Sequence, residues 1–295
     1  MVTFLRYLII LTLFGGVLFW FLTRPQHADA DLFAGVSGDA GRGETIFWAG
    51  GCASCHAAPK AKDEARLVLA GGYRMISPFG TFIAPNISPS EQGLAGWTVQ
   101  DLGNALLYGT SPDGTHYYPA FPYGSYQHMT PQDIADLKAF LDTLPPSDMA
   151  DKPHELGFPF TIRRGIGLWK HLNMSSGWVL KEAGIPALER GRYLVEAVGH
   201  CGECHTPRDW TGGLDRSQWM QGAPNPSGKG RIPGISPAKM DWSATDIVYY
   251  LETGLTPDYD SAGGQMVSVI ANMGHLSKDD RSAIAAYLKA LPENR

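Results

Sequence analysis

The chain carries four cysteines, and all of them belong to two copies of one short motif, C-x-x-C-H. The copies are "CASCH" at residues 52–56 and "CGECH" at residues 201–205, so a histidine follows the second cysteine in both. A fold for this chain must therefore build the same local structure twice. The residues concerned are Cys52, Cys55, His56, Cys201, Cys204 and His205.

The similarity between the halves extends beyond the cysteines and keeps the same order in both. Upstream, "RGETIFWAGGCASCH" parallels "RGRYLVEAVGHCGECH" with one inserted residue. Three further pairs align downstream: "PNISP" with "PGISP", "WTVQDLGNALLYGTSPD" with "WSATDIVYYLETGLTPD", and "MTPQDIADLKAFLDTLP" with "LSKDDRSAIAAYLKALP". The sequence therefore predicts two homologous domains in tandem, residues 35–146 and 186–295, joined by a linker at residues 147–185.

Each half has the pattern of a small, mainly α-helical unit. Thr98 and Ser243 are favourable N-cap residues with an aspartate three positions on, and apolar residues follow at i, i+4 spacing. A glycine marks the end of each of these helices. The last helix of each half repeats the pattern, with Thr130 or Ser277 as the N-cap. A unit of about 100 residues often needs a cofactor to complete its core.

Charge and composition exclude some classes of protein. The net charge is −5, with 24 Lys and Arg against 29 Asp and Glu, and no run of basic residues stands out. Nucleic acid is therefore not an expected partner. The 35 glycines and 21 prolines follow no period, which excludes a collagen-like chain and predicts long structured loops.

The N-terminal residues 1–24 predict a membrane anchor. The run "YLIILTLFGGVLFWFLT" at residues 7–23 has no charge and lies between Arg6 and Arg24, at the short end of the length that spans a bilayer. A cleaved signal peptide is the alternative, with "ADA" at residues 28–30 as the cleavage site. An anchor is favoured because the run exceeds a usual signal core. In both cases the rest of the chain is exported.

The linker contains one amphipathic stretch, "FPFTIRRGIGLWKHL" at residues 158–172. Apolar residues alternate there with the basic Arg163, Arg164 and Lys170. We expect a short helix packed between the two domains. A helix on a membrane surface or a partner is the alternative.

The C-x-x-C-H motif is compatible with several chemistries, of which haem attachment explains every residue. Zinc needs four ligands, a thioredoxin-like dithiol needs a βαβ setting, and a disulfide leaves the histidines unexplained. In haem c, two thiols add to the two vinyl groups as thioethers, and the following histidine is the proximal iron ligand. Two motifs with no cysteine left over therefore predict two covalently bound haem c groups.

With these motifs, the chain resembles the membrane-anchored dihaem cytochromes c related to the cytochrome c subunits of alcohol, gluconate and aldehyde dehydrogenases. The stretches that carry the resemblance are "CASCH", "SPFGTFIAPNISP", "SPDGTHYYPAFPYGSYQHM", "CGECHTPRDWTGG", "GKGRIPGISP" and "GGQMVSVIANMGHLS". The resemblance implies two cytochrome c-like helical domains after one transmembrane helix, in a bacterial inner membrane with the haem domains facing the periplasm. The chain departs from those subunits in carrying two C-x-x-C-H motifs where three are typical.

The sixth iron ligand of a cytochrome c is usually a methionine from the loop before the last helix. In the second domain the candidate is Met266 in "GGQMVSV", with Met273 as the alternative. In the first domain Phe121 aligns with Met266 and cannot bind iron, so Met129 is the predicted ligand. A vacant position remains an alternative, as do Met75, His116 and His128. We expect the other histidines at the surface or at helix ends: His154, His171 and His275.

Two functions from different classes follow from these features. The favoured one is electron transfer from a periplasmic or membrane dehydrogenase to a downstream cytochrome or terminal oxidase of a respiratory chain. Such a carrier or dehydrogenase subunit needs no catalytic residue of its own, and we favour it over a stand-alone enzyme. The alternative is a peroxidase-like dihaem enzyme with an open site at the first haem.

Overall fold

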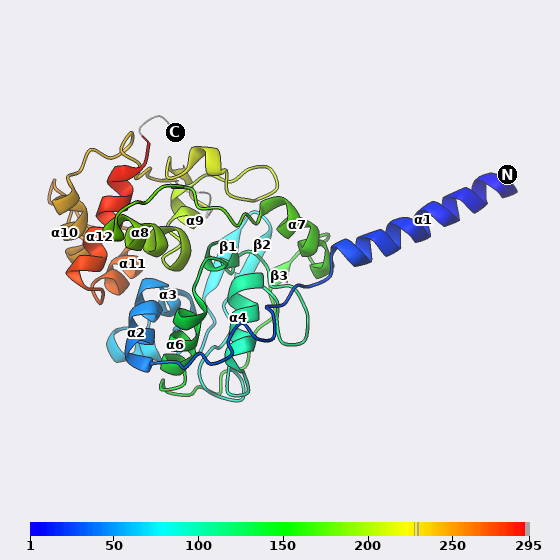
Figure 1. Ribbon diagram of the computed structural model, residues 1–295, viewed down its shortest axis with the longest axis horizontal. Helices are drawn as coiled ribbons and strands as arrows, with labels where there is room; N and C mark the ends of the chain where they lie inside the picture. Colours follow the sequence, from blue (N-terminus) through cyan, green and yellow to red (C-terminus); the bar gives the residue numbers. More distant parts are fainter. Residues whose placement is uncertain (227, 229, 293–295) are drawn as a thin grey trace.

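A computed structural model describes residues 1–226, 228 and 230–292. Residues 227, 229 and 293–295, all in the predicted second domain, lie outside the described residues. One of them, Lys229, belongs to the "GKGRIPGISP" stretch. The described chain forms one long N-terminal helix and a mainly helical body (Figure 1). This confirms the mainly α-helical class and the apolar N-terminal helix that the sequence predicts.

The first helix, α1 (Val2–Leu22), projects away from the body (Figure 1). It has 21 residues, a mean hydropathy of 2.0 and no buried residue, so it is long and apolar enough to cross a membrane. The helix begins five residues earlier than the predicted run, because Arg6 is accommodated within its first turns. Its C-terminal end meets the body at Thr23, which is fully buried.

The first half of the body contains the predicted helices and a small sheet. The capping box of Thr98 and Asp101 is present at the start of α4, and Gly109 ends this helix in the left-handed conformation, so both expectations are confirmed. The elements are α2 (Ala40–Ala49), α3 (Cys52–His56), η1 (Asp63–Leu67), β1 (Arg74–Ser77), β2 (Gly80–Ile83), α4 (Val99–Tyr108), α5 (Tyr123–Tyr126) and α6 (Pro131–Leu141).

The second half repeats this order of helices. Ser243 and Asp246 form the predicted capping box at the start of α10, and Ser277 caps α12. The linker elements are β3 (Glu155–Leu156), η2 (Arg163–Gly165) and α7 (Ile166–Asn173). The elements after the linker are α8 (Pro186–Arg192), η3 (Tyr193–Val198), α9 (Gly202–His205), η4 (Arg216–Gln218), β4 (Ala223–Pro224), β5 (Arg231–Ile232), α10 (Ala244–Thr253), α11 (Met266–Met273) and α12 (Lys278–Ala290).

The first and last helices of each half cross at a glycine. A Cβ atom on Gly43 of α2 would lie 1.9 Å from the carbonyl oxygen of Asp136 in α6. A Cβ atom on Gly191 of α8 would lie 2.0 Å from the carbonyl oxygen of Ala283 in α12. Only glycine allows the two backbones to approach this closely. The same helix crossing therefore occurs twice, at positions that correspond in the aligned repeats.

The inserted residue of the second repeat has a structural counterpart. The segment before the second motif, η3, is a π-helix, whereas the matching turns of α2 are regular α-helix. A π-helical turn accommodates one extra residue without ending the helix. The insertion therefore widens one turn and keeps the start of the motif in place.

The sequence analysis did not predict the sheet β1-β2-β3. Strands β1 and β2 form an antiparallel hairpin, and β3 from the linker pairs with β2 through Gly80 and Thr81. These strands have two to four residues, too few to show a periodic pattern. The sheet attaches the beginning of the linker to the first half.

Candidate haem-binding sites

The first motif forms a helical turn of its own. The chain enters α3 through Gly51, whose φ of 64° lies in the left-handed region. His56 at the end of α3 points its Nδ1 atom at the carbonyl oxygen of Pro85, 2.9 Å away. Because a carbonyl can only accept, Nδ1 must carry the proton, and Nε2 keeps its lone pair.

The second motif repeats this arrangement. The Nδ1 atom of His205, at the end of α9, lies 2.8 Å from the carbonyl oxygen of Pro233. The backbone carbonyls of the two histidines are also bound alike: Gly71 N–H donates to His56 at 2.7 Å, and Gly222 N–H donates to His205 at 2.7 Å. Such a partner fixes the ring orientation and tautomer of a metal-binding histidine.

Pro85 and Pro233 are candidate functional residues that the sequence analysis did not identify. Pro85 and Pro233 begin the aligned stretches "PNISP" and "PGISP", so the repeat was the available signal. Their contribution is a backbone carbonyl, which no side-chain pattern reveals.

Burial shapes the chemistry of the cysteines and histidines. It raises the pKa of Cys52 to about 12, of Cys55 to about 11 and of Cys201 to about 12. Burial also lowers the pKa of His56, which the hydrogen bond to Pro85 partly offsets. Burial therefore favours the neutral thiol and the neutral imidazole at these motifs.

The donor set at each motif fits a c-type haem. Each motif offers two unpaired thiols on one helical turn and one histidine with a free Nε2 atom. Among the described residues, no three His, Cys, Asp or Glu side chains gather closely enough to hold a metal ion by themselves. The motifs thus suit a metal that brings its own equatorial ligands, as haem iron does.

The residues just before the two motifs meet at one backbone carbonyl. The carbonyl oxygen of Gly50, two residues before Cys52, accepts from Tyr126 Oη at 3.3 Å and lies 3.2 Å from His200 Nε2. His200 directly precedes Cys201. The fold therefore brings together two motifs that are almost 150 positions apart in the sequence.

The loops that carry the predicted methionine ligands differ between the halves. Met266 is the first residue of α11 and is half-buried. In the first half the matching position is Phe121, which packs against Tyr117 and Tyr126 with ring centroids 5.8 and 5.6 Å apart. Met129 follows the short helix α5 and is buried.

The alternative ligands have other surroundings. Both ring nitrogens of His116 are engaged, Nε2 with the carbonyl oxygen of Thr23 at 2.8 Å and Nδ1 with Lys170 Nζ at 3.0 Å. His128 stacks on Trp178 with centroids 4.4 Å apart. The methionine alternatives differ in burial: Met273 is buried, and Met75 is half-buried in β1. The contacts therefore disfavour His116 as an iron ligand.

The other histidines have structural contacts. His154 Nδ1 accepts from Ile83 N–H at 3.1 Å, and His171 Nε2 donates to the carbonyl oxygen of Leu22 at the end of α1. His275 stacks on Trp48 of the other half. The expected helix-end role is confirmed for His171, and His275 is exposed as expected while its ring also contributes to the contact between the halves.

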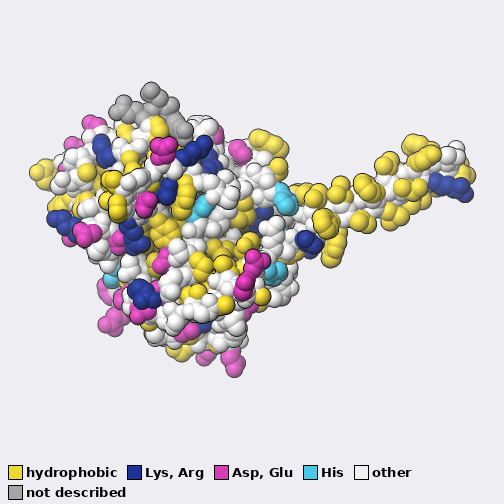
Figure 2. All heavy atoms as spheres, viewed as in Figure 1, with side chains coloured by type: hydrophobic (Ala, Val, Ile, Leu, Met, Phe, Trp, Pro, Cys, Tyr) yellow, Lys and Arg dark blue, Asp and Glu magenta, His cyan; other side chains and the backbone are white. Residues whose placement is uncertain are grey.

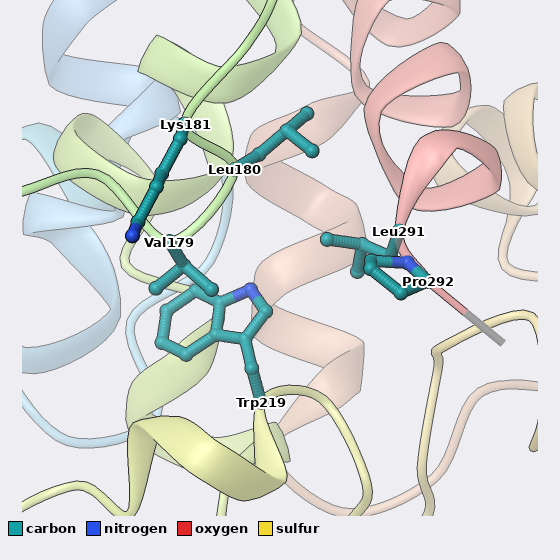
Figure 3. A pocket seen from close by; sticks show the side chains of 6 residues that line it. All are labelled: Val179, Leu180, Lys181, Trp219, Leu291 and Pro292. Atoms are coloured by element: carbon teal, nitrogen blue, oxygen red, sulfur yellow. The ribbon is translucent and has the colours of Figure 1, made fainter. Parts of the chain in front are cut away.

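A cavity beside the second motif contains none of the predicted ligands (Figure 3). Trp219 lines it, and the same ring covers Gly202 of the second motif, where a Cβ atom would lie 2.2 Å from the indole. Trp219 Nε1 donates to Tyr287 Oη at 2.9 Å, which fixes the ring between the cavity and the motif. The lining residues are Val179, Leu180, Lys181, Trp219, Leu291 and Pro292.

The sequence is similar to those of known cytochromes c. The family model for cytochrome c matches residues 40–145. A protein described as "Diheme cytochrome c-type" from Cereibacter sphaeroides is 61% identical over 283 residues, which cover 96% of each chain.

Cytochrome subunits of dehydrogenases are more distant relatives. The fructose dehydrogenase cytochrome subunit of Gluconobacter japonicus is 36% identical, and the alcohol dehydrogenase (quinone) cytochrome c subunit of Gluconobacter oxydans is 33% identical. Each match covers 85% of this chain but only 52% and 54% of those subunits, so the chain spans about half their length. The chain belongs to the family of dihaem c-type cytochromes.

Proposed function

We propose that this protein is a membrane-anchored electron carrier with one haem c in each of two homologous cytochrome c-like domains, residues 35–146 and 186–295. The carrying observation is that each motif histidine donates from Nδ1 to a proline carbonyl, which leaves Nε2 free in both halves. The covalent attachment sites are Cys52, Cys55, Cys201 and Cys204, and the proximal ligands are His56 and His205.

When bound, haem c supplies a reversible one-electron iron couple. The chain's own residues set its environment. Met129 and Met266 are the proposed sixth ligands, and methionine ligation raises the potential. Phe121, in its aromatic cluster, forms an apolar wall in the first domain. The contact at Gly50 keeps the two motifs together, which favours exchange of electrons within the protein.

The proposed location is a bacterial inner membrane, crossed by α1, with the haem domains in the periplasm. The length and exposure of α1 support the anchor. The names of the relatives support a dehydrogenase as electron donor. The proposed acceptor is a downstream cytochrome or a terminal oxidase.

A redox titration of the purified full-length protein, followed by its visible spectrum, tests this function. We expect two reversible one-electron steps and no binding of carbon monoxide by the reduced protein. Stoichiometric carbon monoxide binding by the unmodified protein would show an open haem and favour the peroxidase-like alternative. The Met129→Ala variant should bind carbon monoxide, because it removes the proposed sixth ligand of the first haem.

A further inference from the structure

The segment 158–172, here called the docking segment, lies where α1 joins the body (Figure 1). It contains η2 and most of α7. A Cβ atom on Gly167 of α7 would lie 2.6 Å from the Cα atom of Thr23, so the backbones of α7 and of the end of α1 are in direct contact. The docking segment therefore has a fixed place beside the end of α1.

Side chains of the docking segment bind the last carbonyl groups of α1. Arg164 donates to the carbonyl oxygen of Trp20 at 2.7 Å and to Thr23 Oγ1 at 2.9 Å, and its guanidinium lies 4.1 Å from the centre of a Trp20 ring. His171 donates to the carbonyl oxygen of Leu22 at 2.7 Å. These bonds satisfy carbonyls that a helix end leaves without partners. They also fix how α1 leaves the body.

The docking segment exposes large apolar side chains at this place. Phe158 is 83% exposed and Leu172 is 72% exposed, and three further apolar residues are exposed beside them: Phe160, Ile162 and Leu168. Leu168 and Leu172 lie four residues apart on one face of α7. Figure 2 shows hydrophobic side chains continuing from α1 onto the body at its base.

A tryptophan from the second half extends this apolar surface. Trp210 is 94% exposed in a loop that is attached to α7 by two bonds. Trp169 Nε1 donates to the carbonyl oxygen of Thr211 at 3.1 Å, and Thr211 Oγ1 donates to Asn173 at 2.9 Å. Tryptophan is the residue most typical of the boundary between bilayer and water.

The charged residues of the docking segment itself are all basic, whereas Asp209 next to Trp210 is acidic. The docking segment contains Arg163, Arg164 and Lys170 and no acidic residue, and Arg24 follows α1. Arg163 and Arg24 are exposed. Exposed apolar side chains interleaved with arginines are typical of segments that lie in the headgroup layer of anionic membranes.

We propose that the docking segment and Trp210 rest on the surface of the bilayer that α1 crosses, in contact with anionic phospholipid headgroups. This inference rests on the proposed anchoring by α1. The apolar side chains enter the headgroup and acyl boundary, while the exposed Arg163 and Arg24 bind phosphate groups. The body is then held at a fixed height and orientation above the membrane, rather than tilting together with α1.

Spin labels on single introduced cysteines test this proposal in the full-length holoprotein, reconstituted in nanodiscs of phosphatidylcholine and phosphatidylglycerol. The labelled positions are Phe158→Cys and Leu172→Cys, with Phe14→Cys in α1 as the bilayer reference. Tyr259→Cys is the aqueous reference, because Tyr259 is 92% exposed after α10, which lies at the opposite end from α1 (Figure 1). The unmodified holoprotein should take up no label.

The measurement is the accessibility of each label to oxygen relative to a water-soluble nickel chelate. We expect the labels at positions 14, 158 and 172 to be more accessible to oxygen, and the label at position 259 to be more accessible to the chelate. If the labels at positions 158 and 172 have the same accessibility as the label at 259, while the label at 14 is in the bilayer, the docking proposal is wrong and the proposed anchor stands. If 14 also matches 259, both proposals are wrong. Because the docking positions are exposed, the labels should leave the visible spectrum unchanged.

Discussion

Asp136 and Arg42 form a two-bond ion pair where the first and last helices of the first half cross. Arg42 Nε lies 2.7 Å from Asp136 Oδ2, and its terminal nitrogen lies 2.8 Å from Oδ1. The Asp136 side chain is fully buried, although Arg42 is largely exposed. Oδ1 also accepts from Asp39 N–H at 2.7 Å and from Gln132 of the same helix at 2.8 Å, so the carboxylate joins the start of α2 to α6.

Replacing Asp136 by Asn should lower the free energy of unfolding by about 2 kcal/mol at pH 7, because an amide accepts fewer hydrogen bonds and leaves its own donors buried. Chemical denaturation followed by circular dichroism measures this. Asp280→Asn is the matched control, since Asp280 accepts one bond from Arg190 and is partly exposed. If both variants lose the same free energy of unfolding, the buried hydrogen-bond network of Asp136 stabilises the fold no more than the single bond of Asp280.

The same carboxylate predicts a dependence on pH. Burial acts to raise the pKa of Asp136, but the hydrogen bonds from Arg42, Asp39 and Gln132 outweigh it, so the pKa is lowered from 3.8. A lowered pKa stabilises the fold above the pKa of the unfolded chain, and this contribution is lost as pH falls through the folded value. The difference in stability between the unmodified protein and Asp136→Asn should therefore shrink below about pH 4. A constant difference down to pH 2 would contradict this assignment.

The helix crossing at Gly43 predicts a contrast between two neighbouring glycines. Gly43→Ala should cost about 3 kcal/mol, because the new methyl group meets the backbone of α6. Gly41→Ala in the same helix should be neutral or stabilise by up to about 1 kcal/mol, since its Cβ would meet only the Asp39 side chain. Because the second half has the same crossing, Gly191→Ala should be as damaging as Gly43→Ala. Thermal unfolding of the three variants decides this.

The proposed methionine ligands predict different spectra for two variants. Met266→Ala should remove one methionine–iron charge-transfer band from the oxidised spectrum and lower one potential. Met129→Ala should make the first haem high-spin and open to carbon monoxide. Met273→Ala and Met75→Ala are the controls. If Met273→Ala or Met75→Ala changes the spectrum in one of these ways instead, the methionine replaced in that variant is the iron ligand.

The helices were predictable because their signals are local. The capping boxes at Thr98 and Ser243 depend on residues three positions apart, and the π-helix at Tyr193–Val198 reflects one inserted residue that the repeat revealed. The hydrogen-bond partners of the motif histidines were not predictable, because they are backbone carbonyls 28 and 29 positions away.

The surroundings of the linker were only partly predictable. The helix α7 was expected, and it contacts both halves through Lys170, which donates to the carbonyl oxygen of Gly109 at 2.9 Å, and through Trp169, which donates to Thr211. Its contact with the end of α1 involves residues about 150 positions apart, which no local pattern encodes.

The central claim is that this chain holds one haem c at each C-x-x-C-H motif. Mass spectrometry of the purified protein after acid-acetone extraction tests it most directly, because the extraction removes haem that is not covalently bound. We predict a mass equal to the chain plus two haems, with one haem lost when both cysteines of either motif are replaced by alanine. A mass showing one haem or none in the unmodified protein would contradict the claim.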